Sequence, residues 1–188
     1  MRVLRRWRAF LLSLSAPTVV TAAAGLFLGV AIVAASEKQE TALAVAGPGP
    51  GGARNLMLAP NLSFTDDSSS NFPIRGENLE DGKVASDRPT AIFFGTSHCW
   101  NTNREAERFV ALAAREKEAV RFIVVDLDRP SGDQRMLVSR FYRGYIPTLA
   151  FLDASGKAVY NRSGETASRR GDTSGLEEIL RKASAPSR

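Results

Sequence analysis

The stretch Arg143-Gly-Tyr-Ile-Pro-Thr-Leu149 leads into an apolar segment, residues 148–152. The tetrapeptide Asp153-Ala-Ser-Gly156 follows, and a second strand-like segment then covers residues 157–161. Turn-forming residues between two short, strand-like segments are typical of a β-hairpin. The two segments are therefore predicted to be neighbouring antiparallel strands, with the proline at the entrance of the first.

Strand-like and helix-like patterns alternate along the chain around this hairpin. Short apolar runs indicate buried strands, and apolar residues that recur at helical spacing indicate helices. The predicted elements outside the hairpin cover, in chain order, residues 90–94, 101–118, 120–125 and 132–143, followed by a helix that Asp172 or Thr173 caps. The order β-α-β-α-β-β-α predicts an α/β fold, a mixed sheet with helices on both faces.

A second motif, Phe94-Gly-Thr-Ser-His-Cys99-Trp-Asn-Thr102, lies where a predicted strand ends and a helix begins. Cys99 is the only cysteine of the chain, which excludes an intrachain disulfide and a metal site made of cysteines alone. A thiolate at the N-terminus of a helix is stabilised by free backbone N–H groups and by the helix dipole. Cys99 is therefore a candidate nucleophile, and the alternative is a buried, inert cysteine.

The order of the elements and these two motifs resemble the thioredoxin fold over about residues 85–184. The resemblance implies that Pro147 follows a cis peptide bond and faces Cys99, the position of the nucleophilic cysteine. It also implies that the main chain around Pro147, at Ile146 and Thr148, holds an extended substrate by hydrogen bonds.

The sequence departs from the thioredoxin pattern at three positions. Thr102 stands in place of the second cysteine, so a mixed disulfide on Cys99 needs an external thiol to release it. Phe93 stands where many thioredoxins have a buried aspartate, and His98 replaces the usual tryptophan. The motif is therefore a one-thiol variant, which disfavours efficient dithiol reductase activity.

Three neighbours of Cys99 each have two interpretations. His98 is a candidate partner of the thiolate or of a substrate, or else a surface histidine. Trp100 contributes to a peptide-contacting platform, or it packs against the helix start. Thr102 donates a hydrogen bond to the thiolate one turn away, or it serves only as a helix-start residue.

The N-terminal 35 residues have the pattern of a membrane anchor. Four arginines lie within the first eight residues, and the 27 positions from Ala9 to Ala35 carry no charge. A membrane-spanning helix needs about 20 apolar residues, whereas the apolar core of a signal peptide has about 7–15. The length favours an uncleaved anchor, and cleavage after Ala35 is the alternative. The positive-inside rule places the rest of the chain outside the cytoplasm, in the periplasm of a Gram-negative cell.

Residues 36–71 have the composition of a flexible linker. They include Gly-Pro-Gly-Pro-Gly-Gly at 47–52 and Asp-Asp-Ser-Ser-Ser-Asn at 66–71, which bury too little apolar surface to offset the entropy of ordering. The predicted organisation is an anchor or signal segment at 1–35, a linker at 36–71 and a thioredoxin-like domain at 72–188.

The charge distribution argues against nucleic acid as a partner. The 25 basic residues exceed the 20 acidic ones by five, and four of the basic residues belong to the N-terminal arginine cluster. The rest of the chain is close to neutral, and no basic face with interleaved aromatic residues stands out. We expect no cofactor and no metal, because the chain has a single histidine beside its single cysteine.

The sequence is compatible with two main functions. The first is thiol–disulfide exchange through Cys99 with protein thiols or disulfides on the extracytoplasmic side of a membrane. The second is a non-catalytic module that binds extended peptide or protein in the same groove, with Cys99 incidental. An accessory role in copper handling or cytochrome assembly is a weaker alternative, because the chain lacks the paired cysteines such proteins use.

Overall fold

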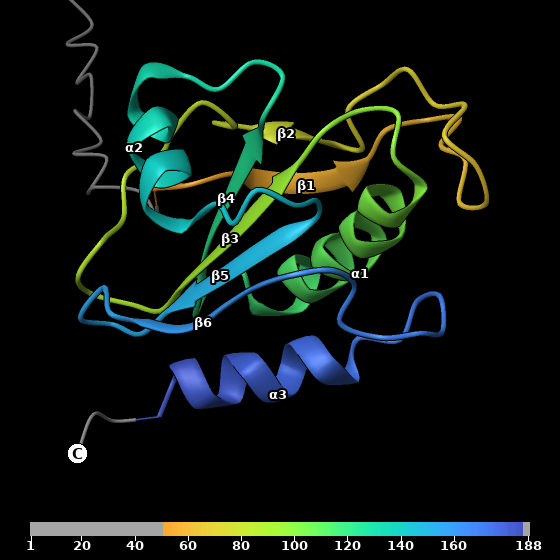
Figure 1. The fold of residues 1–188 in the computed structure, drawn as a ribbon. Helices are drawn as coiled ribbons and strands as arrows, with labels where there is room; N and C mark the ends of the chain where they lie inside the picture. Colours follow the sequence, from red (N-terminus) through yellow and green to blue (C-terminus); the bar gives the residue numbers. More distant parts are fainter. Residues whose placement is uncertain (1–50, 186–188) are drawn as a thin grey trace, which may run out of the picture. The chain divides into compact units, whose positions relative to one another are not determined.

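A four-stranded sheet forms the centre of the fold (Figure 1), and the computed structural model describes residues 51–185. In spatial order the strands are β4 (Arg121–Asp126), β3 (Thr90–Gly95), β5 (Thr148–Leu152) and β6 (Ala158–Ser163). Strand β3 runs parallel to β4 and antiparallel to β5, and β5 runs antiparallel to β6. The sheet is therefore mixed, as predicted, and each strand ends within about two residues of its predicted bounds.

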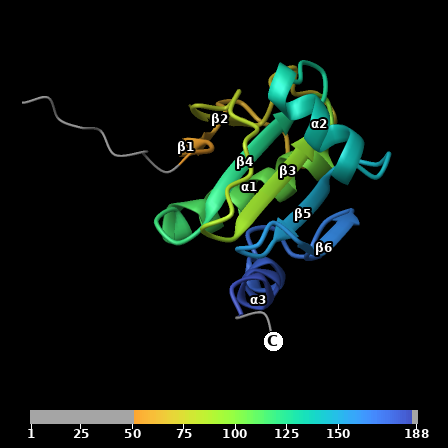
Figure 2. The same ribbon diagram turned by 90° about the vertical axis from the view of Figure 1, so that its left-hand side faces the viewer.

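Helices cover both faces of this sheet. Helices α1 (Trp100–Glu116) and α3 (Ser174–Ala183) lie on one face, and α2 (Gly132–Phe141) lies on the other (Figure 2). Alternation along β3 explains this arrangement, because Phe93 joins the core under α1 and α3 whereas Phe94 joins the core under α2. Strands that are apolar on both faces need a helix layer on each side.

Residues 51–71 differ from the prediction of a flexible linker. Strand β1 (Arg54–Leu58) pairs antiparallel with β2 (Ile74–Glu77) in a separate two-stranded sheet. The Ala53 N–H also donates a 2.7 Å hydrogen bond to the Phe122 carbonyl at the edge of β4. Apolar side chains of β1 and β2 pack against the core beneath α1. Their burial offsets the entropy cost of ordering the neighbouring polar residues. Those polar residues are the reason why the composition of the segment resembles that of a linker.

The predicted anchor, residues 1–35, and residues 36–50 of the predicted linker lie outside the described residues. Within residues 51–185, no helix combines the length and the apolar character that crossing a membrane requires. The predicted domain start at residue 72 falls in the connection between β1 and β2, so the described fold begins upstream of it.

Helix α2 ends two residues earlier than predicted, before the segment that leads to Pro147. It stops at Phe141, because Tyr142 already has an extended backbone and its N–H bonds to the Val138 carbonyl. The residues that follow, 142–147, therefore form an irregular connection between α2 and β5.

Candidate thiol site

The loops that carry the two predicted motifs start from the same edge of the central sheet. Phe94, next to the last residue of β3, pairs with Thr148, the first residue of β5. The loop that leaves β3 toward Cys99 therefore begins beside the position where Pro147 enters β5. Antiparallel pairing brings these two loops together, although they lie far apart in the sequence.

Cys99 is the N-cap residue of α1. Its backbone is extended, with φ −146° and ψ 107°, and its carbonyl accepts a 3.0 Å hydrogen bond from the Asn103 N–H. The side chain makes no capping hydrogen bond, and the residue is half-buried. Cys99 is thus the residue immediately before the first turn of the helix.

The Ile146–Pro147 peptide bond is cis, as the resemblance implies. Pro147 is buried and its carbonyl accepts a 2.8 Å hydrogen bond from the Gly164 N–H, while Ile146 is half-buried. Tyr145 is 75% exposed, a large aromatic side chain in solvent next to the cis bond. The sequence alone does not indicate Tyr145 as a site residue, because an exposed tyrosine has no local signature.

Thr148 is fully buried, and its hydroxyl hydrogen-bonds to the loop before β5. The Thr148 hydroxyl donates a 2.6 Å hydrogen bond to the Tyr145 carbonyl and lies 2.9 Å from the Ser163 hydroxyl. Its side chain thus supports the shape of the proline loop from inside, and the whole residue is buried in β5 between β3 and β6.

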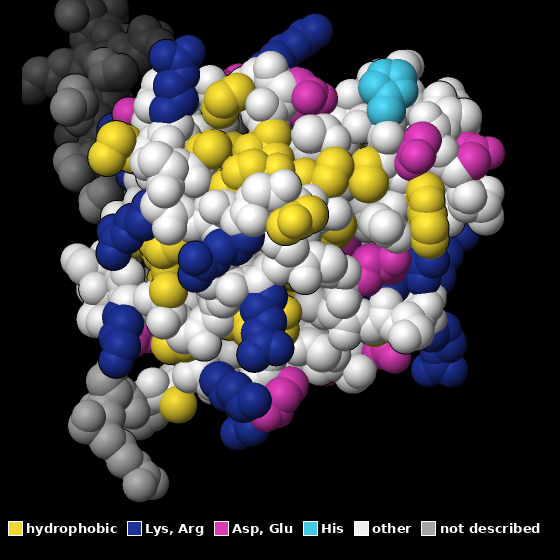
Figure 3. Space-filling view, viewed as in Figure 1, with side chains coloured by type: hydrophobic (Ala, Val, Ile, Leu, Met, Phe, Trp, Pro, Cys, Tyr) yellow, Lys and Arg dark blue, Asp and Glu magenta, His cyan; other side chains and the backbone are white. Residues whose placement is uncertain are grey.

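His98 and Trp100 flank the cysteine in different environments. His98 is exposed and has a left-handed backbone, with φ 54°, and the single histidine of the chain (cyan in Figure 3) lies at the molecular surface. Trp100 is half-buried, and the Arg104 guanidinium lies 5.1 Å from the centre of its ring. His98 is therefore open to a partner, whereas part of Trp100 already contacts its own helix.

Thr102 is completely buried at the position of the missing cysteine. A methyl group built on Gly95 would lie only 2.5 Å from Thr102 Cγ2, so the helix start packs directly on the end of β3. Within the described residues, the Thr102 hydroxyl has no hydrogen-bond partner, the Cys99 sulfur included. Phe93, which replaces the thioredoxin aspartate, packs its ring against Phe109 with 5.4 Å between the ring centres.

A loop between β1 and β2 crosses the start of α1, and we call residues 62–70 the strap. The Ser69 carbonyl accepts a 2.9 Å hydrogen bond from the His98 N–H. The Ser63 carbonyl accepts a 2.8 Å hydrogen bond from the side-chain amide of Asn103, 40 positions away in the sequence. The strap belongs to the predicted linker, and its contacts with the thiol site do not follow from the sequence alone.

Two carboxylates hold the backbone on either side of Cys99. Asp67 Oδ1 accepts a 2.7 Å hydrogen bond from the Trp100 N–H. Asp128 Oδ2 accepts hydrogen bonds from the Ser97 N–H at 3.2 Å and from the Ser97 hydroxyl at 3.1 Å. These contacts join positions 33 and 31 residues apart, and no local sequence pattern indicates them.

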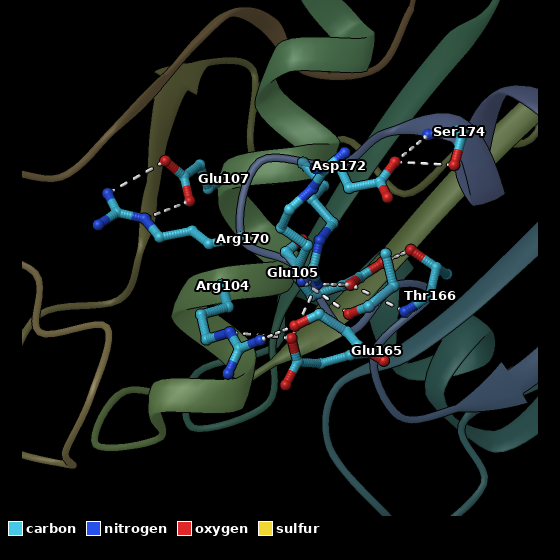
Figure 4. A network of polar contacts seen from close by, with 12 residues as sticks. Arg104, Glu105, Glu107, Glu165, Thr166, Arg170, Asp172 and Ser174 are labelled. Atoms are coloured by element: carbon cyan, nitrogen blue, oxygen red, sulfur yellow. Dashed lines mark hydrogen bonds and ion pairs between the residues drawn. The ribbon is translucent and has the colours of Figure 1, made fainter.

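Helix α1 is anchored on another side by a network of charged residues (Figure 4). Arg104 Nε and Arg108 Nη1 lie 3.1 Å and 2.9 Å from Glu165 Oε2. Glu165 belongs to the connection between β6 and α3, residues 164–173. The network therefore fixes that connection to the helix that begins beside Cys99.

No protein-family model matches the chain, and no curated protein matches it. Among solved structures it is similar to the thioredoxin of Fasciola hepatica, with 23% identity and a TM-score of 0.42 over 53% of this chain and 85% of that one. The thioredoxin of Malassezia sympodialis is 20% identical, with a TM-score of 0.42 over 54% of this chain and 79% of that one. Mitochondrial thioredoxin 3 of Saccharomyces cerevisiae is 16% identical, with a TM-score of 0.39 over 51% and 79% of the two chains.

The described domain has a thioredoxin-like fold. The mixed sheet, the antiparallel pairing of β5 with β6 and the helices on both faces agree with the predicted fold. The cis bond before Pro147 lies at the expected edge of this sheet.

Proposed function

We propose that the protein is a membrane-tethered, extracytoplasmic thioredoxin-like protein that exchanges disulfides through Cys99. The observation that supports this best is the half-exposed position of Cys99 at the N-terminus of α1, at the sheet edge where the cis-Pro147 loop enters β5. Separate experiments, given below, test the membrane tether and the exchange through a single thiol.

The proposed reaction runs in two exchanges, each of which conserves electrons between sulfur atoms. The Cys99 thiolate attacks one sulfur of a partner's disulfide, so that a Cys99–partner disulfide forms and the partner's other sulfur leaves as a thiolate. An external thiolate then attacks the mixed disulfide, bonds to the partner's sulfur and releases Cys99 as a thiolate. Because the chain has no second cysteine, this second thiol belongs to another molecule.

The loop before β5 is the proposed contact for the partner's backbone. Tyr145 is exposed and Ile146 is half-buried, so both present surface next to the cis bond. In the proposed complex, main-chain groups just before Pro147, at Ile146, hydrogen-bond to an extended segment that carries the partner's sulfur, because β5 itself already pairs with β3 and β6. His98 and Trp100 would contact the same segment from the side of α1.

The test is to trap adducts of Cys99 in cells that express the full-length chain. Free thiols are blocked by alkylation at the moment of lysis, and the extract is separated on non-reducing gels. Wild type should give adducts that disappear on reduction and are missing in Cys99→Ser. The Ser139→Ala variant, at an exposed position of α2, is the matched control and should retain the adducts. A wild type without adducts would contradict the exchange reaction.

A non-catalytic binding module is the second candidate. The Asp67 carboxylate already accepts a hydrogen bond from an N–H at the helix start, and the chain has no second cysteine that could resolve a mixed disulfide. Both facts disfavour repeated thiol–disulfide exchange. In this case the full-length chain should recover the same partners by pull-down whether residue 99 is cysteine or serine. Loss of recovery in Cys99→Ser would instead support the covalent mechanism.

The tether is proposed from the sequence of residues 1–35. The arginines before an uncharged stretch of 27 residues favour an anchor with its N-terminus in the cytoplasm. The chain should then fractionate with membranes and resist extraction by carbonate, and a membrane-impermeant thiol reagent should label Cys99 from outside the cytoplasmic membrane. Release of a shortened chain into the soluble fraction would instead favour a cleaved signal peptide.

A further inference from the structure

The Asp67 carboxylate occupies the N-terminus of α1 immediately beside Cys99. Its Oδ1 accepts the Trp100 N–H at 2.7 Å, and that nitrogen is bonded directly to the carbonyl carbon of Cys99. Standard bond lengths then place the carboxylate oxygen within about 5 Å of the Cys99 Cα. Helix α1 has no acidic residue in its first turn and no side-chain hydrogen bond from its N-cap residue. The strap thus supplies the anionic cap from outside the helix.

A carboxylate and a thiolate compete for the same end of a helix. Each anion is stabilised there by the dipole and by free N–H groups. A carboxylate that is already bound uses one of these N–H groups, and its charge repels a second anion close by. We infer that Asp67 is a positioning residue that suppresses thiolate formation at Cys99 and so slows the exchange reaction proposed above, on which this inference rests.

Other charged groups face the same region from several elements. His98 lies on the loop of Cys99 itself, and Arg104 lies on α1 over the ring of Trp100. Asp128 approaches from the segment after β4 and holds Ser97. Acidic side chains (magenta in Figure 3) are visible on the part of the surface that carries the histidine. Since all of these stay in place, a substitution limited to Asp67 isolates its contribution.

The neighbouring residue Asp66 offers a matched comparison within the strap. Asp66 Oδ1 accepts the Ser68 N–H at 3.0 Å, and the Asp66 N–H bonds to the Ser63 hydroxyl at 3.1 Å. Hydrogen bonds from Ser63 and Ser68 lower the pKa of Asp66 to about 2, so this carboxylate is charged at neutral pH. Its hydrogen bonds stay inside the strap, whereas Asp67 reaches the helix.

The experiment measures the rate at which iodoacetamide, an uncharged reagent, alkylates Cys99 in the full-length protein. Asp67→Asn keeps an oxygen for the Trp100 N–H and removes the charge. The alkylation rate near neutral pH should rise about two- to fivefold, the usual range for one charge at a helix end, and the rate profile should shift toward lower pH. Asp66→Asn removes the same charge one residue away and should change the rate by a smaller factor.

Two results would overturn the inference. Equal rates in Asp67→Asn and wild type would show that the carboxylate leaves the sulfur unaffected, and equal increases in both variants would assign the effect to the general charge of the strap. In either case, alkylation of Cys99 in the folded protein would still be compatible with the proposed exchange reaction. If Cys99 reacts only after unfolding in every variant, the proposed exchange fails, and the inference fails with it.

Discussion

Arg108 and Glu105 form a 2.6 Å ion pair one turn apart on α1, and both side chains are completely buried. Thr166 donates to the Glu105 carboxylate through its N–H at 3.1 Å and its hydroxyl at 2.7 Å. Arg108 also donates to the Ala167 carbonyl at 2.8 Å. Buried charges are tolerated when paired and hydrogen-bonded in this way. The pair therefore holds the connection after β6 against the helix that begins at the thiol site.

Removal of the Arg108 guanidinium should strongly destabilise the fold. Arg108→Ala leaves Glu105 buried without its cation, and we expect the free energy of unfolding to fall by about 3–5 kcal/mol in chemical denaturation. Arg115→Ala on the same helix is the control, because its 2.6 Å ion pair with Glu177 is about half exposed. That variant should lose at most about 1 kcal/mol. Similar losses in the two variants would contradict a special role for the buried pair.

A methyl group at position 95 should disturb the contact between β3 and α1. The new Cβ would lie 2.5 Å from Thr102 Cγ2 and 2.8 Å from Phe93 Cε1, both in buried side chains. Gly95→Ala should therefore lower the free energy of unfolding by about 1–3 kcal/mol. Gly132→Ala, in the first turn of α2 with open space around it, should leave stability unchanged or raise it by up to about 1 kcal/mol. Thermal or chemical unfolding of both variants checks the opposite signs.

The unpartnered hydroxyl of Thr102 gives a substitution with opposite effects on stability and reactivity. Thr102→Val removes a buried hydroxyl that has no hydrogen-bond partner within the described residues, so the free energy of unfolding should rise by about 1 kcal/mol. If this hydroxyl donates to the Cys99 thiolate as that anion forms, alkylation of Cys99 should become slower. An unchanged alkylation rate would make Thr102 a packing residue of the helix start.

A cysteine at position 102 should restore the second thiol of the motif. Positions three apart on a helix start lie within the range that a disulfide spans. Thr102→Cys should therefore form an intrachain disulfide with Cys99, and the yield of mixed disulfides in the trapping experiment should fall. The Cys99→Ser/Thr102→Cys double variant has only one thiol and cannot form this bond. Unchanged adduct yield, with both thiols free in an oxidising buffer, would contradict the prediction.

Asp81 should make stability depend on pH in the acidic range. Partial burial acts to raise its pKa, but the N–H groups of Gly52 and Lys83, each 2.9 Å from the carboxylate, and the charge of Arg121 lower the pKa below its ordinary value. A carboxylate with a lowered pKa stabilises the fold above its unfolded-state pKa, and this stabilisation is lost as the pH falls through the folded-state pKa.

The comparison is between wild type and Asp81→Asn. Wild type should be the more stable of the two near neutral pH, and the difference should shrink and be lost as the pH falls through the lowered folded-state pKa of Asp81. Urea denaturation at a series of pH values measures this difference. A difference that stays constant over the whole range would mean that Asp81 acts through its hydrogen-bonding shape and not through its charge.

The sequence by itself determined the elements of the central sheet and its helices. Residues 91–94 and 122–125 are apolar at consecutive positions, a pattern that indicates a strand buried on both faces, and the turn after residue 152 defines the hairpin. Cys99 and Pro147 were recognised because each belongs to a motif of neighbouring residues. Such local patterns depend only on short stretches of chain, so no tertiary information is needed to detect them.

Only the tertiary structure decided what surrounds the sulfur. Asp67 reaches Trp100 across 33 positions of sequence, and Glu105 reaches Thr166 across 61. The strap and β1 come from a segment whose Gly-Pro and Asp-Ser runs give it the composition of a linker. In the structure, Leu56 and Leu58 nevertheless pack against the core, and Asp67 binds a distant backbone N–H. Composition and periodicity record how much a segment can bury, but they carry no information about which distant groups its polar atoms will bind.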